Sequence, residues 1–415
     1  MKKIFVSAYA CEPGLGSEIG VGWHWVLEMS RYFELWVLTR ESNRRTIEPW
    51  VAEHPEYAKI HFVYFDLPHW ARRWKRGMRG VRIYYMLWQW LSDGVVKRTM
   101  QENGIDTYHL LTYGNAMWPA SRYGMKQRFG WGPVSAGVML PKFLTKHFSW
   151  KSRLKEEAQR VMRWLLPLNV GFRRRCKHAD LILCKTDDTI VCVPEKWRGK
   201  CVQMTDVAVE RRDVESYLTP KRYDDTKINY VAAGTLVGWR TMDVLIEAWI
   251  NSQLSTLNSQ LTIVGDGPER VRLERLVDEL GVRDSVRFVG QVDMETYYSY
   301  IAQADVVVNP CFREGAVTVS FDSMAMGKPL ICFDTGGYTH YFEPEYSRVI
   351  GGVKSREEAV ERLARAMAEL ADRELIARMG AEAKRRSEEL SWEKKIESIV
   401  NSQGSIDNSP YGTID

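Results

Sequence analysis

The chain has 415 residues, of which 45% are hydrophobic and 27% are charged. This composition is typical of a globular protein with room for two domains, and it excludes an intrinsically disordered chain. The chain has no run of about 18 apolar residues, so we expect no membrane-spanning helix. The net charge of +5 hides an asymmetry, because residues 1–200 carry 33 Lys and Arg against 18 Asp and Glu. The split favours two domains with different partners.

The cysteines and the N-terminus indicate a cytoplasmic protein. The seven cysteines are odd in number and lack the spacing of a disulfide framework, so we expect reduced thiols. Residues 1–14 carry two lysines, but their short apolar stretch leads into a glycine loop and not into a small-residue cleavage site. We therefore expect a first strand there and no signal peptide.

Short apolar segments alternate with helical patterns along the whole chain, which predicts βαβ units and parallel sheets. A helix is expected near 18–31 and another over 268–281. The predicted strands of the first half are 2–10, 33–39, 59–65, 106–112 and 179–185. Those of the second half are 227–234, 260–267, 285–290, 304–310 and 329–335.

The pattern predicts two α/β domains joined by a polar segment. We expect an N-terminal domain over 1–209, a linker over 210–226, a C-terminal domain over 227–388, a helix over 389–403 that packs back on the first domain, and a flexible tail over 404–415.

The loop "EPGLGSEIGVG" follows the first predicted strand and precedes a helix that begins near Ser17. Its glycines stand at positions 14, 16, 20 and 22. A glycine-rich turn at a helix N-terminus suits an anion, and tight strand–helix packing is the structural alternative. The loop also resembles a loose dinucleotide fingerprint, but the second strand ends in Thr39 and Arg40, where such a site requires an acid.

Arg240 stands immediately before a predicted helix that opens the second α/β half. A guanidinium binds phosphate oxygens through two parallel hydrogen bonds, so Arg240 is a candidate ligand for a diphosphate. A solvated surface arginine is the alternative.

The stretch "REGAVTVSFDSMAMGKP", residues 313–329, places two acids where a buried strand gives way to a helix. Glu314 is expected at the carboxyl end of a parallel strand, where such sheets bind ligands, and Asp322 one turn into the helix. Between them, the amides of Ala316, Val317 and Thr318 point out of the helix N-terminus towards a phosphate. Two solvated acids on a loop and a helix would give the same spacing.

Two segments combine cations with aromatic residues. Residues 69–90 hold six Lys and Arg and six aromatics, and residues 146–178 repeat the pattern. Such segments suit an anionic membrane surface, with core aromatics beside a solvated basic face as the alternative. The chain shows no nucleic-acid-binding motif, so we expect no nucleic-acid partner.

Taken in order, these stretches resemble the retaining nucleotide-sugar glycosyltransferases of family 4. The resemblance is strongest over 228–340, in "GTLVGWRTMDVLIEAW", "LTIVGDGPE", "VRFVGQVD", "ADVVVNP" and "REGAVTVSFDSMAMGKPLICFDTGG", and it continues more loosely in "SAYACEPGLGSEIGVGW". It implies the α/β GT-B fold, in which two Rossmann-like domains with parallel sheets face a central cleft. It also implies transfer of a hexosyl group from a UDP or GDP sugar to an acceptor hydroxyl, with no cofactor.

The resemblance also implies roles for the acids and the cation. Glu314 would contact the donor sugar near the reacting carbon, and Asp322, one methylene shorter than the family's glutamate, would contact the ribose. Arg240 matches one phosphate-binding cation, whereas Thr235 replaces the other. Gly16 is the one glycine left to approach the diphosphate, because Leu15 replaces its neighbour.

Further roles follow from the same resemblance. Backbone groups from Gly290 to Val292 would contact the base, and His109 falls near a histidine of the family's catalytic region. The chain has no Asp-x-Asp, in keeping with a metal-independent reaction.

The acceptor would be a saccharide or a lipid-linked molecule in cell-surface polysaccharide or glycolipid assembly, which would place the protein on the inner face of the membrane. A catalytically degenerate nucleotide-sugar-binding protein remains an alternative, because Thr235, Leu15 and Asp322 depart from the family's pattern. An NAD(P)-dependent oxidoreductase is another, although it leaves the acid pair without a role.

Overall fold

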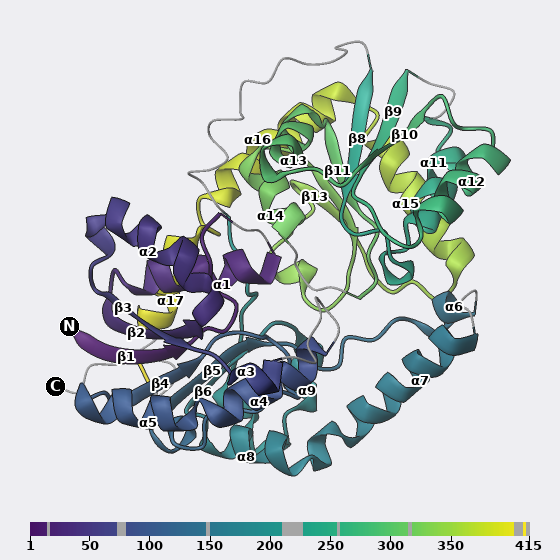
Figure 1. Ribbon diagram of the computed structural model, residues 1–415. Coiled ribbons are helices and arrows are strands. Elements are labelled where there is room, and N and C mark those ends of the chain that lie inside the picture. The colour runs from purple at the N-terminus through teal and green to yellow at the C-terminus, as the bar shows by residue number, and fades with distance from the viewer. Residues whose placement is uncertain are drawn as a thin grey trace. The chain divides into compact units, whose positions relative to one another are not determined.

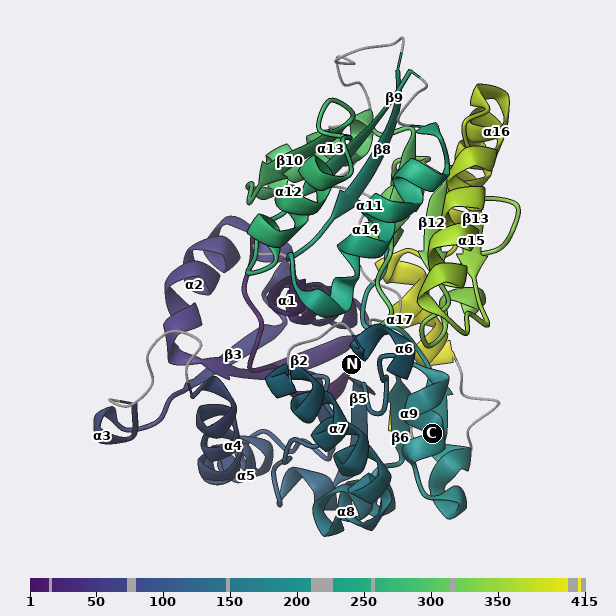
Figure 2. The same cartoon turned by 90° about the vertical axis from the view of Figure 1, so that its right-hand side faces the viewer.

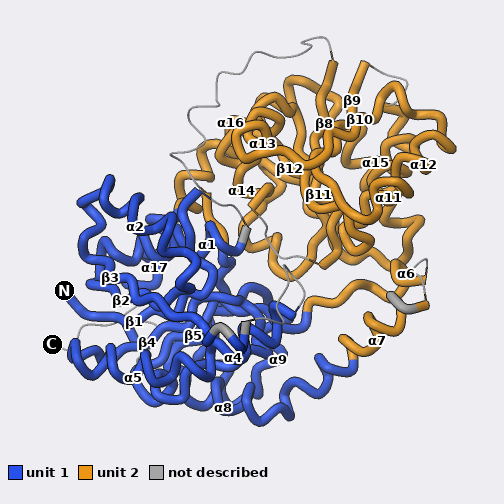
Figure 3. The backbone as a smooth tube through the Cα atoms, viewed as in Figure 1, with its two compact units in different colours: residues 1–137, 161–206, 392–415 blue, residues 138–160, 207–391 orange. Residues whose placement is uncertain are grey.

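The computed structural model describes residues 1–14, 17–72, 80–146, 150–209, 227–254, 258–313, 318–401 and 410–411. The chain divides into two compact units, coloured separately in Figure 3. Unit 1 comprises Met1–Gly137, Val161–Asp206 and Trp392–Asp415, and unit 2 comprises Val138–Arg160 and Val207–Ser391. Each unit is built on one parallel sheet, which confirms the predicted α/β class.

Unit 1 has a seven-stranded sheet in the order β3-β2-β1-β4-β5-β6-β7 (Figure 1). The strands are β1 Lys2–Ser7, β2 Phe33–Arg40, β3 Ile60–Phe65, β4 Thr107–Leu110, β5 Arg128–Val134, β6 Leu181–Cys184 and β7 Cys201–Gln203. Because the strand order changes direction between β1 and β4, the carboxyl ends of these two strands mark the ligand-binding position of such a sheet.

The helices of unit 1 connect these strands and cover the sheet. They are α1 Ser17–Met29, α2 Arg44–Glu53, α3 His69–Arg72, α4 Val81–Leu91, α5 Asp93–Glu102, α8 Val170–His178, α9 Asp187–Cys192 and α17 Trp392–Asn401. The core between sheet and helices is rich in aromatic rings, among them Tyr9, Tyr85, Trp88 and Trp131.

Unit 2 has a six-stranded sheet in the order β10-β9-β8-β11-β12-β13. The strands are β8 Ile228–Ala233, β9 Ser259–Val264, β10 Val286–Gly290, β11 Val306–Asn309, β12 Leu330–Phe333 and β13 Ser347–Ile350. Here the order changes direction between β8 and β11. Arg240 and Glu314 belong to the segments that follow these two strands. Both segments therefore begin at the same edge of the sheet.

The helices of unit 2 form two groups. Helices α11, α12 and α15 pack together, as do α13, α14 and α16, and Figure 2 shows α15 and α16 near β12 and β13. Their bounds are α6 Lys142–Thr145, α11 Met242–Asn251, α12 Arg270–Glu279, α13 Met294–Gln303, α14 Thr318–Ala325, α15 Arg356–Glu369 and α16 Arg373–Ser387. One further helix, α7 Trp150–Leu165, contains the division between the units, after Arg160.

Three strands of the structure, β5, β7 and β13, are absent from the predicted set. β5 contains Gly130, Gly132 and Pro133, which are depleted in strands, so its sequence gives little strand signal. β7 has only three residues, and β13 begins with the polar Ser347 and Arg348, so neither shows an apolar run.

The division of the chain also differs from the expected domain boundaries. Residues 138–160 were expected in the first domain, but Leu140 and Leu144 lie in the core of unit 2 and the ring of Phe143 meets the edge of Phe312. The expected linker and most of the tail lie outside the described residues. Within the tail, Tyr411 is buried in unit 1, in contrast to the flexible segment expected there.

Candidate active site

The turns that follow β8, β9 and β10 pack directly on one another. Gly234, Gly265 and Gly290 have φ angles of 146°, 137° and 92°, which favour glycine. A Cβ on Gly265 would lie 2.1 Å from the carbonyl oxygen of Gly234, and the Gly265 amide donates to the Gly290 carbonyl oxygen at 2.9 Å. The ligand-binding edge of this sheet is therefore formed by closely packed backbone.

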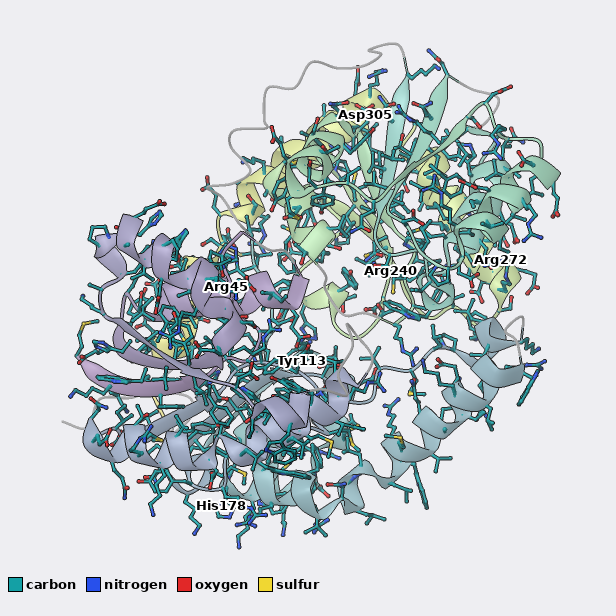
Figure 4. All side chains as sticks on the ribbon, in the orientation of Figure 1. Arg45, Tyr113, His178, Arg240, Arg272 and Asp305 are labelled. Atoms are coloured by element: carbon teal, nitrogen blue, oxygen red, sulfur yellow. The ribbon has the colours of Figure 1, made fainter. Side chains whose placement is uncertain are left out.

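Arg240 lies on these turns. It ends a short 3-10 helix, Gly238–Arg240, and a Cβ on Gly234 would lie 2.5 Å from its Nη1 atom. The next residue, Thr241, has a left-handed backbone, and its hydroxyl donates to the carbonyl oxygen of Pro310 beyond β11. Figure 4 shows Arg240 at one end of the unit 2 sheet and Asp305, which precedes β11, at the other. Thr235 is exposed in the same segment.

Asp322 is buried in α14, and its Oδ2 atom accepts a hydrogen bond from the Tyr297 hydroxyl of α13 at 2.7 Å. Burial, and then the Asp322 carboxylate, raise the pKa of Tyr297 well above its usual value, and the positive charge of Arg240 acts in the opposite direction. Arg240, Tyr297 and Asp322 therefore lie within electrostatic range of one another. Tyr297 was not predicted as a site residue, because nothing in the sequence pattern of its helix distinguishes it from a core tyrosine.

Of the other predicted donor-site residues, Thr318 begins α14, Gly290 is buried, and Val292 is half-buried just beyond β10. Glu314, Ala316, Val317 and Gly16 lie outside the described residues.

The segment before Glu314 is held by α7. Arg313 donates from Nη1 to Oε1 of Glu156 at 3.0 Å and from Nη2 to Oε2 at 2.9 Å, and Gln159 accepts a further bond from it. The Glu156 side chain is almost fully buried. A bidentate pair of this kind fixes the orientation of the chain that leads into the predicted catalytic loop.

We expect Glu156→Ala to lower the free energy of unfolding of the protein by about 3–5 kcal/mol, because it leaves the half-buried Arg313 without its carboxylate. Urea unfolding followed by tryptophan fluorescence measures this change. The matched control is Glu157→Ala, which removes an exposed carboxylate whose bond to Arg160 contributes about 0–1 kcal/mol.

A double variant, Glu156→Leu with Arg313→Met, separates stability from function. Replacing both partners by apolar side chains should restore most of the stability. If the sugar-transfer rate stays low in this stable protein, the ion pair positions the loop; equal stability of the Glu156→Ala and Glu157→Ala proteins would contradict the buried pair.

In unit 1, charged residues gather beyond the carboxyl ends of the strands. Glu18 accepts a hydrogen bond from the Gly114 amide at 2.9 Å, and Lys185 forms an ion pair with Asp206. A Cβ on Gly114 would lie 3.1 Å from Lys185 Nζ. Burial raises the pKa of Glu18, and the Lys185 charge opposes this shift. This cluster was not predicted: Glu18 belongs to the glycine loop and Lys185 ends a predicted strand, but no sequence spacing relates them.

The glycine loop of unit 1 partly serves packing. A Cβ on Gly22 of α1 would lie 2.0 Å from the carbonyl oxygen of Ala10, so Gly22 permits the close approach of this helix to the end of β1. Helix α1 begins at Ser17, as expected, and Gly14 has a φ of 71°.

His109 lies in the core of unit 1 with both ring nitrogens in hydrogen bonds. Its Nε2 atom bonds to the Gly132 carbonyl oxygen at 2.8 Å, and its Nδ1 atom pairs with the hydroxyl of Tyr411. Burial lowers the pKa of His109 to about 4, so the ring is neutral at physiological pH. These surroundings favour a structural role.

The described residues contain no group of three or more His, Cys, Asp or Glu side chains placed to hold a metal ion. In the same residues, no helix has the length and apolar character needed to cross a membrane.

Residues 215–386 match the family model described as glycosyl transferases group 1. The chain contains a group 1 glycosyltransferase domain. The lipopolysaccharide core biosynthesis glycosyltransferase LpsD of Rhizobium meliloti is 43% identical over 74 residues, or 18% of this chain and 21% of that protein. Among the first curated relatives, the matched segments span 21% to 46% of the relatives' own lengths.

Solved structures resemble this chain over nearly its whole length. Sucrose-phosphate synthase from Thermosynechococcus elongatus has a TM-score of 0.65 and 19% identity, covering 96% of this chain and 97% of that chain. HepE of Anabaena in complex with UDP has a TM-score of 0.58 and 13% identity, covering 98% and 100%. The fold is therefore GT-B, which confirms the fold that the resemblance implied.

Proposed function

We propose that the protein is a metal-independent hexosyltransferase that moves a sugar from a nucleoside diphosphate sugar to an acceptor hydroxyl with retention at the anomeric carbon. The observation that carries the proposal is Arg240, which lies on the packed glycine turns within the segment that matches the group 1 model. UDP or GDP is the proposed nucleotide, and the UDP complex of HepE supports UDP. No cofactor takes part.

Each donor contact has a proposed role in unit 2. Arg240 and the amides of Ala316, Val317 and Thr318 bind the diphosphate, with Thr235 beside it. Negative charge builds on the diphosphate as it departs, so these donors stabilise the transition state more than the ground state.

The ends of the donor are bound by other groups. Glu314 contacts the sugar, Asp322 reaches the ribose together with the Tyr297 hydroxyl, and Gly290 and Val292 contact the base. His109 has no catalytic role in this proposal.

Unit 1 is proposed to bind the acceptor, with Gly16 contributing to the diphosphate contact. The match to LpsD supports a saccharide or lipid-linked acceptor in the assembly of a surface polysaccharide or glycolipid. We place the enzyme in the cytoplasm, bound to the inner face of the membrane.

The test is a thermal-shift screen of UDP-, GDP- and ADP-sugars followed by assays of donor hydrolysis and sugar transfer. We expect a uridine or guanosine nucleotide to stabilise the protein, and NMR of the product to show the anomeric configuration of the donor. Binding without transfer or hydrolysis would indicate a degenerate binding protein. Stabilisation by NADPH alone would favour an oxidoreductase.

A further inference from the structure

Helix α7 exposes an apolar face. Trp150, Leu154, Val161 and Leu165 recur at spacings of four and seven residues, which places them on one side of the helix. Their exposed fractions are 67%, 64%, 54% and 43%, and the neighbouring Trp164 is 75% exposed. Figures 1 and 2 show α7 as the long helix between α6 and α8.

The other side of α7 is polar and faces the protein. Glu156 pairs with Arg313, Arg160 Nη2 donates to the Leu140 carbonyl oxygen at 2.6 Å, and Arg163 Nη2 donates to Asp188 Oδ1 at 2.7 Å. A helix at a protein surface normally buries its apolar side and exposes its polar side. The reversed arrangement indicates that an apolar medium covers the outer face of α7.

The exposed apolar surface continues past the helix through Leu168 and Val170. The segment that carries it is rich in positive charge, because residues 150–178 contain nine Lys and Arg against two Glu, and Arg153, Lys155, Arg174 and Lys177 are exposed. Tryptophan near both ends of an apolar stripe, with cations beside it, matches the chemistry of the boundary between anionic headgroups and acyl chains.

The other aromatic and basic segment offers less exposed apolar surface. In α4, Tyr84, Tyr85 and Trp88 are buried in the core of unit 1 against Tyr9. The exposed large apolar residues in the described part of residues 69–91 are Trp70, Ile83, Trp90 and Leu91. The α7 face is therefore the larger of the two surfaces in the described residues.

We propose that the α7 face, defined as the exposed apolar residues from Trp150 to Val170, inserts into the interfacial region of an anionic lipid bilayer. This lipid contact deepens the proposed function, because it names the surface at which the enzyme would meet its acceptor. It rests on the proposed function only for the assumption that the acceptor is lipid-linked. The same helix binds Arg313, so the lipid contact and the predicted catalytic loop share one element.

The test uses the full chain and sedimentation with vesicles of phosphatidylcholine, with or without phosphatidylglycerol. We expect at least about tenfold more binding to the anionic vesicles, weakened by high salt. Leu154→Glu combined with Trp164→Glu should reduce binding at least about tenfold. The matched control is Val271→Glu on α12, where Val271 is 62% exposed, and it should bind as the unchanged protein does.

Equal binding to neutral and anionic vesicles, or full binding by the double variant, would overturn the proposal. A protein that binds no vesicles but forms a concentration-dependent dimer would also overturn it if the double variant abolishes that dimer. In that case a second copy of the chain would cover the α7 face. A thermal-shift measurement with UDP in the absence of lipid tests the proposed function independently of the lipid contact. A protein that binds vesicles but no nucleotide would contradict the proposed function and not the lipid contact.

Discussion

Glu314→Ala is expected to lower sugar-transfer turnover by about 10²–10³-fold or more, because it removes the carboxylate proposed to face the reacting carbon of the donor sugar. The fold and the affinity for the free nucleotide should persist, since the diphosphate and base contacts come from other residues. Initial rates of transfer, thermal shift with UDP or GDP, and circular dichroism measure the three properties separately.

Two further variants distinguish charge from general disturbance. Glu314→Gln keeps the shape of the side chain and should be nearly as inactive as Glu314→Ala if the negative charge matters. Glu279→Ala, at the exposed end of α12, removes a carboxylate that has no role in the proposed site and should leave turnover unchanged. Full activity of Glu314→Ala would remove Glu314 from the mechanism.

The fold was predictable where the hydrophobic pattern is strong. β11, Val306–Asn309, is fully buried and apolar in its first three residues, and the last four residues of β8 and of β9 are buried and mostly apolar. The strands that were missed lack this signal: β5 contains two glycines and a proline, and β13 begins with Ser347 and Arg348. Local pattern therefore located the strands whose side chains fill the core, and failed where glycine or polar residues interrupt the apolar run.

Sequence spacing related the candidate site residues to one another only where they lie in one segment. Glu314 and Asp322 share one segment, and the family resemblance gave them roles. Tyr297 lies 25 residues from Asp322, and Glu156 lies 157 residues from Arg313, so no local spacing could pair them. Such contacts come from tertiary packing alone.

Tertiary packing also decides which aromatic residues of the two aromatic and basic segments are exposed. The composition of 69–90 resembles that of 146–178, yet the rings of Tyr84, Tyr85 and Trp88 lie in the core whereas Trp150 and Trp164 are exposed. A helix whose polar side is held by ion pairs, as in α7, cannot be distinguished by composition from one that buries its aromatic side. Only the position of the partners, such as Arg313, decides which side faces out.

Arg240→Ala is expected to weaken nucleotide-sugar binding by about 1.5–3 kcal/mol, the contribution of a hydrogen bond to a charged group, which corresponds to roughly 10- to 100-fold in Kd. Turnover should fall by a further factor of about 10²–10³, because the guanidinium is proposed to face the oxygens on which charge develops as the diphosphate leaves. Isothermal titration with UDP measures the first effect, and saturating transfer assays measure the second.

The structure supplies a matched control for Arg240. Arg272 on α12 is an arginine of the same unit, half-exposed and paired with Glu269. Figure 4 labels Arg240 and Arg272. Arg272→Ala should leave binding and turnover unchanged, so a loss confined to Arg240→Ala cannot come from the reduced net charge. Arg240→Lys should recover part of the binding but less of the turnover, since an ammonium keeps the charge and loses the paired donors. If Arg240→Ala raises KM and leaves kcat intact, Arg240 binds the ground state and transition state equally, and stabilisation of the leaving group must come from the helix amides.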